Sequence, residues 1–309
     1  MKRIAIIDMG TNTFHLLIGA LVESKFSILY REKVPVKIGV GGINQGIITP
    51  DAISRAVTTM KSFKSTITEM KITEVLAIGT SALRNAQNKD DVIKRIQTET
   101  GIRAQLISGL EEARYIYQGA RAAIPLGEEK CLIMDIGGGS VEFIIGNQVE
   151  IFWSQSFEIG GQRLLERFQK HDPILKTEID QLFAYIDEEL SPLWQALQDH
   201  KPLTLIGSSG TFDTLSDIYC FRNDIPVQET PETPFSIQAF DEIYEELLVK
   251  DRSARMQIPG MIEMRVDMIV VACCLIKFLL MKHTFKHVRV SSYSLKEGVL
   301  ASFANSNRL

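Results

Sequence analysis

The sequence lacks the features that mark several large classes of protein. It has only four cysteines in 309 residues, and two of them, Cys273 and Cys274, are adjacent. Neighbouring cysteines make a poor disulfide, and none of the four has metal-site spacing, so we expect small core residues. The longest apolar run, residues 268–276, is too short to span a bilayer. Asp8 interrupts the N-terminal apolar run too early for a signal peptide. We therefore predict a soluble, cytoplasmic protein with no membrane partner.

The sequence also lacks a large excess of positive or negative charge. The formal net charge is only −4 and the pI is about 5.8, so there is no basic field for duplex nucleic acid. No G-x-x-x-x-G-K-[ST] segment is present, which excludes a P-loop enzyme, and the absence of a G-x-S-x-G elbow disfavours a serine hydrolase. The five histidines show no metal spacing. A polyanionic ligand would have to be met by local amides, a few Arg or Lys side chains and a metal ion.

What the chain does contain is one signature that occurs twice. Residues 5–13 read A-I-I-D-M-G-T-N-T, and residues 132–140 read L-I-M-D-I-G-G-G-S. Each is an apolar strand that ends in an aspartate, Asp8 or Asp135, followed by a turn of glycine and small polar residues. The spacing between the two copies is the length of a domain. Two such turns on successive domains suggest one ligand held between them, and phosphate suits their free amides.

Strands in a meander, followed by strands that alternate with helices, predict a mixed α/β sheet in each half. We place domain I at residues 1–124 and domain II at residues 125–309. The C-terminal helix, about residues 296–309, is allowed to pack back on domain I. In domain II we expect a single helix over about 177–198 and a buried helix over 262–282.

Three turns that follow apolar strands could hold phosphate. Glycine lets the backbone approach an anion, and successive amides and hydroxyls can donate to its oxygens. Any one of these could be an ordinary tight turn, but three together favour a ligand. Arg84 lies in a fourth strand-turn-helix segment. Its guanidinium could bind phosphate through two parallel N–H groups, or it could be a surface residue. The candidates in the three turns are Gly10, Thr11, Asn12, Thr13, Gly137, Gly138, Gly139, Ser140, Ser208, Ser209, Gly210 and Thr211.

Two adjacent glutamates differ in their local role. Ser108 and Glu111 have the S-x-x-E spacing of a capping box, which gives Glu111 a structural explanation. Glu112 points about 100° further round the helix. It is either a surface glutamate or a general base, and we choose it first as the base.

Carboxylates beside the repeated turns could hold a cation. Asp135 and Glu142 flank the second turn, well placed to hold Mg²⁺ against a phosphate, with Mn²⁺ as the alternative. Asp8 is a further candidate ligand. For Asp8 an equally good explanation is that it ties down its turn by accepting hydrogen bonds from the turn amides.

Taken together, these segments resemble the exopolyphosphatase/guanosine pentaphosphate phosphohydrolase family. The matching segments are I-D-M-G-T-N-T-F-H-L-L-I, T-S-A-L-R-N-A, I-S-G-L-E-E-A-R, D-I-G-G-G-S-V-E-F and G-S-S-G-T, and weaker matches include F-E-I-G-G-Q-R-L-L-E-R-F and S-L-K-E-G-V-L. The resemblance covers essentially the whole chain. It implies the short form of an actin-like ATPase superfamily member, with two tandem actin-like (ribonuclease H-like) α/β domains around a phosphate-binding cleft.

The resemblance also implies roles for single residues. Glu112 aligns with the family's catalytic glutamate, Asp135 and Glu142 with cleft carboxylates that bind metal, and Arg84, the glycine turns and Arg265 with phosphate-binding positions. Lys37 stands where a basic residue usually precedes a G-x-G turn. Two departures bear on substrate preference: Val141 replaces a usual threonine, and Lys296 replaces a usual arginine.

The reaction expected is hydrolysis of a terminal phosphoanhydride bond, with water activated by Glu112 and the phosphate held by the turns, Arg84 and Mg²⁺. Inorganic polyphosphate is the first expected substrate and guanosine pentaphosphate the second. An actin-like sugar kinase and a non-catalytic polyphosphate or nucleotide sensor stay as more remote alternatives. For the assembly state, a homodimer is the arrangement that we consider.

Overall fold

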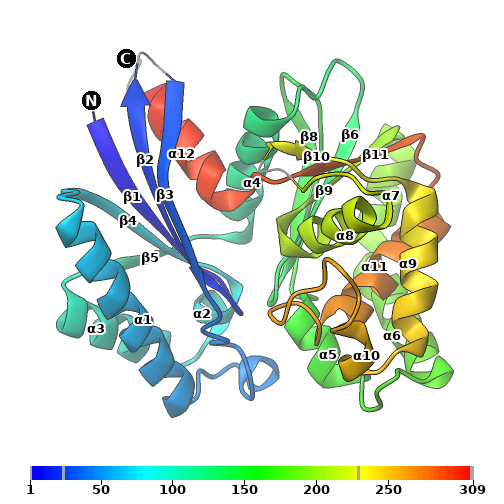
Figure 1. Cartoon of the computed structure of the whole chain (residues 1–309), viewed down its shortest axis with the longest axis horizontal. Helices are drawn as coiled ribbons and strands as arrows, with labels where there is room; N and C mark the ends of the chain where they lie inside the picture. The colour runs from blue at the N-terminus through cyan, green and yellow to red at the C-terminus, as the bar shows by residue number, and fades with distance from the viewer. Residues whose placement is uncertain (1, 23–24, 228–229, 307–309) are drawn as a thin grey trace. The chain divides into compact units, whose positions relative to one another are not determined.

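The computed structural model of the chain describes residues 2–22, 25–227 and 230–306, which form two compact units. Unit 1 takes in the chain up to Gly119 and again from Leu295, and unit 2 runs from Ala120 to Ser294. Each unit contains one mixed sheet flanked by helices (Figure 1), as the α/β prediction expects. The division falls inside helix α4 (Gly109–Ala123), whereas the sequence suggests a break just after it, at residue 124.

The sheet of unit 1 has five strands in the order β3-β2-β1-β4-β5. Strands β1, β2 and β3 form an antiparallel meander, and β4 and β5 continue it in parallel. This is the predicted change from meander to alternating strands and helices. The strands are β1 (Lys2–Met9), β2 (Phe14–Val22), β3 (Lys25–Val34), β4 (Glu74–Gly79) and β5 (Ala104–Leu106).

Helices cover both faces of this sheet because its central strands are apolar on both sides. Alternate residues such as Ile7 belong to the core that α1 covers, together with Phe63 of that helix. On the other face α12 packs on β1 and β2, and Leu300 fills the space beside Gly19, where a Cβ would overlap it. The helices of unit 1 are η1 (Ile43–Gln45), α1 (Pro50–Glu69), α2 (Ser81–Asn85), α3 (Lys89–Thr100), α4 and α12 (Leu295–Ser306).

The sheet of unit 2 has six strands in the order β10-β11-β9-β6-β7-β8. Strands β6, β7 and β8 repeat the antiparallel meander, and β9 pairs with β6 in parallel, as β4 pairs with β1 in unit 1. The strands are β6 (Cys131–Ile136), β7 (Val141–Gly146), β8 (Ile151–Phe157), β9 (Thr204–Ser208), β10 (Glu232–Thr233) and β11 (His287–Ser291).

Two helix predictions in unit 2 are wrong in their bounds. The helix predicted over 177–198 is two helices that meet at Leu190. Pro192 lacks an N–H and would clash with the carbonyl one turn earlier, so a continuous helix cannot pass it. The helix predicted over 262–282 begins only at Ile269, and residues 263–268, three of which are charged, form turns before it. The helices are α5 (Gly161–Phe168), α6 (Lys176–Glu189), α7 (Ser191–His200), α8 (Ser209–Arg222), α9 (Ile237–Val249), α10 (Arg252–Arg255) and α11 (Ile269–Lys282).

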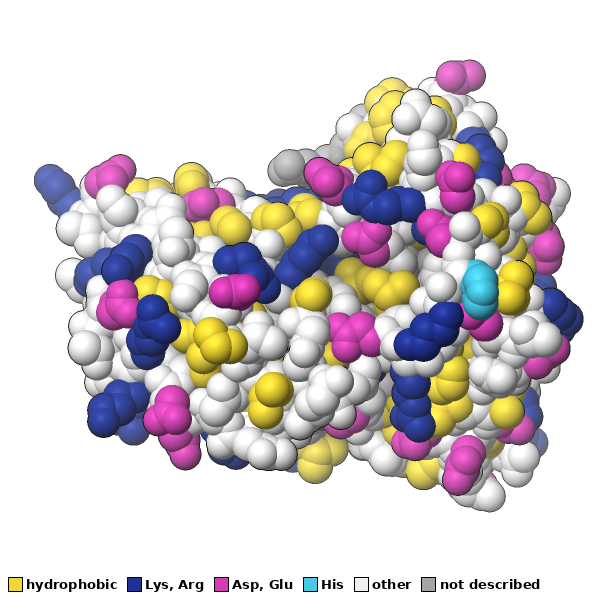
Figure 2. All heavy atoms as spheres, turned by 90° about the horizontal axis from the view of Figure 1, so that it is seen from below, with side chains coloured by type: hydrophobic (Ala, Val, Ile, Leu, Met, Phe, Trp, Pro, Cys, Tyr) yellow, Lys and Arg dark blue, Asp and Glu magenta, His cyan; other side chains and the backbone are white. Residues whose placement is uncertain are grey.

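The surface is mixed in charge. On the face drawn in Figure 2, basic and acidic side chains are interspersed, in keeping with the small net charge. Among the described residues, none of the helices is long and apolar enough to cross a membrane.

Candidate active site

The first repeated turn connects β1 to β2 in unit 1. Met9 lies opposite Phe14, so the turn consists of the four residues between them, and Asp8 lies opposite His15. Thr11, Asn12 and Thr13 are buried. The carbonyls of Thr11 and Asn12 accept hydrogen bonds from the backbone amides of Gly39 (3.0 Å) and Lys37 (2.8 Å). The turn is therefore backed by the loop that follows β3.

The loop behind this turn is itself fixed by an arginine. Lys37 has a left-handed backbone conformation, with φ of 51°. Arg55 of α1 donates from Nε to the Val36 carbonyl (2.8 Å) and from Nη2 to the Lys37 carbonyl (2.9 Å). These bonds hold the strained residue in place. The G-x-G pattern in the sequence marks this loop, but no local pattern reveals its contact with the turn.

The predicted base, Glu112, lies in the first turn of α4. The capping box is confirmed, because Ser108 N donates to Glu111 Oε2 (2.8 Å) and Glu111 N donates to Ser108 Oγ (3.2 Å). Glu112 is buried, and its Oε2 accepts from Arg84 Nη1 at 2.8 Å. Arg84 also donates to the Ile107 carbonyl (3.2 Å). The structure thus brings together two residues that the sequence offers separately, and Glu112 is not a surface glutamate.

The second repeated turn connects β6 to β7 in unit 2. Ile136 lies opposite Val141, so four residues again form the turn, and Asp135 lies directly opposite Glu142. Directly opposed residues point to the same face with Cβ atoms about 5 Å apart. Both carboxylates are nearly fully buried, at 5% and 1% exposure. Two buried like charges at this spacing repel each other unless a cation or a proton lies nearby.

Hydroxyl groups surround these carboxylates. Asp135 accepts from Ser209 Oγ (2.7 Å) and from Ser208 Oγ (2.9 Å), one bond to each carboxylate oxygen. Glu142 Oε1 accepts from Ser156 Oγ of β8 at 2.7 Å. Ser208 and Ser209, which the sequence predicts to bind phosphate, thus donate their hydroxyl hydrogens to Asp135. Ser156 has no signal in the sequence, because its place beside Glu142 depends on the β7–β8 register.

The glycine turn of unit 2 rests on the start of α5. The carbonyls of Gly137, Gly138 and Gly139 accept from three successive backbone amides of residues 161, 162 and 160, at 2.9, 2.8 and 3.2 Å. A Cβ on Gly160 would overlap the backbone of the turn. Glycine at this position is therefore required by the close approach of α5.

The third predicted turn lies between β9 and α8. Ser209 has φ of 70°, an unusual value for a residue with a side chain. A Cβ on Gly210 would overlap the guanidinium of Arg265, so this arginine lies against the turn. Burial lowers the pKa of Arg265, while the charges of Asp213 and Asp135 oppose that shift. A guanidinium stays charged at neutral pH, so Arg265 places a positive charge near Asp135.

The residues around Asp135 fit a divalent cation in part. Two adjacent buried carboxylates with hydroxyl neighbours form a hard oxygen set of the kind that Mg²⁺ prefers, since Mg²⁺ completes its shell with water and phosphate oxygens. Within the described ranges, no group of three or more His, Cys, Asp or Glu side chains is arranged to hold a metal by itself. A cation here would need a ligand such as phosphate to complete its shell.

The two departures from the family pattern lie in different units. Val141 is fully buried in the hydrophobic core of unit 2, on the sheet face opposite to that of Glu142. In unit 1, Lys296 Nζ pairs with the buried Glu297 at 3.3 Å.

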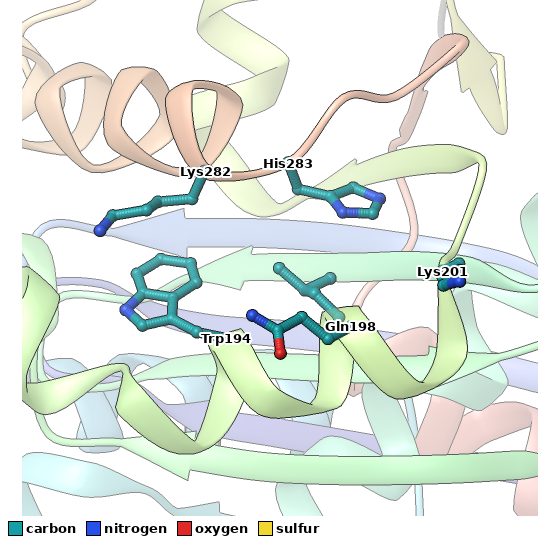
Figure 3. A pocket seen from close by; sticks show the side chains of 6 residues that line it. Trp194, Gln198, Lys201, Lys282 and His283 are labelled. Carbon is teal, nitrogen blue, oxygen red and sulfur yellow. The ribbon is translucent and has the colours of Figure 1, made fainter.

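A hollow of about 350 Å³ also lies in unit 2, between α7 and the end of α11. Figure 3 shows Trp194 and Gln198 on one side and Lys282 and His283 on the other. Several of its polar groups are already used: Trp194 Nε1 donates to the Asp187 carbonyl, and His283 Nε2 lies 2.9 Å from the Pro202 carbonyl. Pro202 precedes β9, whereas the turn that is predicted to bind phosphate follows that strand. The hollow is therefore not part of the candidate active site.

Comparisons with known proteins point in one direction. A family model described as the Ppx/GppA phosphatase family matches residues 17–307. The crystal structure of an exopolyphosphatase from Cytophaga hutchinsonii is 44% identical, with a TM-score of 0.96, covering 99% of this chain and 98% of that chain. The Aquifex aeolicus PPX-GPPA enzyme is 25% identical, with a TM-score of 0.78 and coverage of 97% and 99%. A curated Haemophilus influenzae protein, provisionally named an exopolyphosphatase, is 26% identical over 302 residues, 98% of this chain and 91% of its own length.

Proposed function

Because the chain belongs to the Ppx/GppA phosphatase family, we propose that it hydrolyses the terminal phosphoanhydride bond of inorganic polyphosphate and releases orthophosphate. The predicted family, the actin-like fold class and the assignment as a hydrolase of phosphoanhydrides are confirmed at the level of the family. The choice of polyphosphate over guanosine pentaphosphate is our proposal. It is supported by the 44% identity to a protein described as an exopolyphosphatase.

The observation that carries the proposal is the Arg84–Glu112 pair in unit 1. Glu111, the neighbour of Glu112, is occupied by the helix cap, so Glu112 alone of the two has a buried carboxylate oriented by a cation. In the proposed reaction a water molecule gives a proton to the Glu112 carboxylate, and its oxygen bonds to the terminal phosphorus. The bond from that phosphorus to the bridging oxygen breaks, and the shortened chain leaves with the electron pair.

Electrostatic stabilisation of the phosphoryl oxygens falls to the turns and to Arg265. The backbone amides of the two repeated turns (residues 10–13 and 137–140) and of the β9–α8 turn are the hydrogen-bond donors. The Arg265 guanidinium supplies positive charge. Lys37 supports the first turn through its backbone amide, which donates to the Asn12 carbonyl at 2.8 Å. Asp135 and Glu142 would hold Mg²⁺, or Mn²⁺, which would neutralise phosphate charge when bound.

Phosphate release from a substrate panel tests the proposal. Long polyphosphate, tripolyphosphate, guanosine pentaphosphate and ATP are compared, each with Mg²⁺, Mn²⁺ or EDTA. We expect release from long polyphosphate, without any acceptor, that depends on the divalent cation. Release only from guanosine pentaphosphate would move the assignment to the alternative nucleotide substrate. Transfer that requires a sugar acceptor would indicate a kinase, and tight polyphosphate binding without release would indicate a sensor.

A further inference from the structure

The carbonyl groups of Gly137, Gly138 and Gly139 all face the start of α5, and this fixes the direction of the neighbouring backbone N–H groups. In a trans peptide the N–H points opposite to the C=O of the same peptide unit. With the carbonyls of residues 137, 138 and 139 bonded to α5, the N–H groups of Gly138, Gly139 and Ser140 are directed away from that helix. These are the amides that a bound phosphoryl group would use.

One side chain joins the backbone amides in this arrangement. Arg163 of α5 donates from Nε to the Gly139 carbonyl at 2.8 Å, and this carbonyl also accepts from the Gly160 amide at 3.2 Å. Both lone pairs of the carbonyl oxygen are thereby used. The peptide unit that carries the Ser140 N–H is thus held by two donors, one of them charged.

The arginine is itself held at its other end. Its Nη2 donates to Glu158 Oε2 at 3.0 Å, and its side chain is only 15% exposed. A planar guanidinium fixed by a carboxylate on one edge and a carbonyl on another has little freedom to turn. It is therefore suited to holding a peptide plane at a set angle.

We propose that Arg163 is a positioning residue for phosphate binding: it fixes the Gly139–Ser140 peptide so that the Ser140 N–H faces the phosphoryl group. This inference rests on the proposed function, and it adds to it a residue that contacts no substrate. Its effect reaches the substrate only through the backbone of the turn.

Inorganic phosphate binding by calorimetry, together with KM and kcat for polyphosphate, tests this role in Arg163→Met. The matched control is Arg167→Met, which removes an arginine from the same helix where it lies over the Tyr185 ring, 4.2 Å away. We expect phosphate affinity to fall roughly tenfold or more in Arg163→Met, as for loss of a charge-assisted bond. KM should rise in parallel, and Arg167→Met should bind phosphate as the wild type does.

Arg163→Lys and Glu158→Gln keep the test decisive if Arg163→Met folds poorly. In Arg163→Lys the ammonium is a donor but lacks the planar guanidinium, so phosphate affinity should recover in part. In Glu158→Gln the loss of phosphate affinity should be smaller than in Arg163→Met, because the bond from Arg163 Nε to the Gly139 carbonyl remains. Unchanged phosphate affinity in folded Arg163 variants would overturn the inference while leaving hydrolysis intact. Conversely, Arg163-dependent phosphate binding by a wild type that releases no phosphate from polyphosphate would overturn only the proposed function.

Discussion

The two repeated turns, residues 10–13 after Asp8 and residues 137–140 after Asp135, are built on the same plan. They differ in the residue that lies opposite the aspartate. In both units a four-residue turn joins antiparallel strands, and a parallel strand lies on the other side of the aspartate's strand. Asp135 faces Glu142, whereas Asp8 faces His15. The second turn therefore concentrates negative charge in a buried place, while the first pairs a half-buried carboxylate with a half-buried imidazole. This difference favours unit 2 for the cation.

The turns also differ in what supports them from behind. In unit 1 the turn carbonyls accept from the loop at Lys37 and Gly39, and helix α4 is capped by its own Ser108 and Glu111. In unit 2 the amides at the start of α5 are used on the turn, and Gly160 offers no side-chain cap. The start of α4 thus positions Glu112, whereas the start of α5 shapes the backbone of the 137–140 turn.

The largest difference should appear when each aspartate loses its charge. In Asp135→Asn we expect phosphate release at fixed Mg²⁺ to fall by about 100-fold or more, because a preorganised charge is lost. In Asp8→Asn the loss should stay below about tenfold, as expected for a residue that shapes its turn. Activity across a Mg²⁺ titration checks both, and equal losses would contradict the assignment of the cation to unit 2.

Exchanging the opposing residue should have the next largest effect. Glu142→His gives the second turn the pair that the first one has, and we expect Mn²⁺ affinity to drop at least roughly tenfold. Electron paramagnetic resonance of free Mn²⁺, recorded in the presence of inorganic phosphate, measures this affinity without any turnover. His15→Gln is the control in unit 1 and should bind Mn²⁺ as the wild type does. Loss of Mn²⁺ binding in His15→Gln would place the cation in the first turn.

Backbone strain gives a smaller contrast. Ser209 has φ of 70°, whereas Thr80, which follows the corresponding strand β4 in unit 1, is extended with φ of −109°. Ser209→Gly and Ser209→Ala both lose the hydroxyl bond to Asp135, but only glycine relieves the strain. We expect the glycine variant to be more stable than the alanine variant by about 1 kcal/mol. Urea unfolding compares the two, and equal stabilities would mean that Ser209 is not strained.

The smallest effect concerns the cap of α4. Bonds from Ser108 lower the pKa of Glu111 below its ordinary 4.5. The folded state therefore favours the charged form, so the cap contributes stability above about pH 4.5 and loses it as the pH falls through the lowered pKa. Glu111→Gln should be less stable than the wild type by about 0.5 kcal/mol at neutral pH. Thermal melts at several pH values should show this gap closing in acid, and a gap that widens there would contradict the cap.

Local patterns in the sequence were enough to predict what depends on neighbouring residues. The spacing of Ser108 and Glu111 separated the cap from Glu112, and the structure confirms the capping box. The mixed sheets followed from the order of apolar segments. The predicted helix bounds failed at Pro192, where a second helix starts, and before Ile269, where residues 263–268 form turns.

Contacts between distant segments were beyond such patterns. Ser208 and Ser209 were predicted to bind phosphate, but their place beside Asp135 depends on the parallel pairing of β6 and β9. The support of the glycine turn by α5 joins residues more than twenty positions apart through backbone groups, which carry no sequence signal. The pairing of Arg84 with Glu112 likewise needs the fold of unit 1.

The measurement that tests the central claim most directly is phosphate release from long polyphosphate by Glu112→Gln beside its neighbour Glu111→Gln. Both variants remove one charge from the same helix turn. We expect Glu112→Gln to lose about 100-fold or more in kcat while it still binds polyphosphate, because the general base is gone. Glu111→Gln should keep near-normal turnover. Near-normal turnover in Glu112→Gln, or equal losses in the two variants, would contradict the assignment of Glu112 as the base.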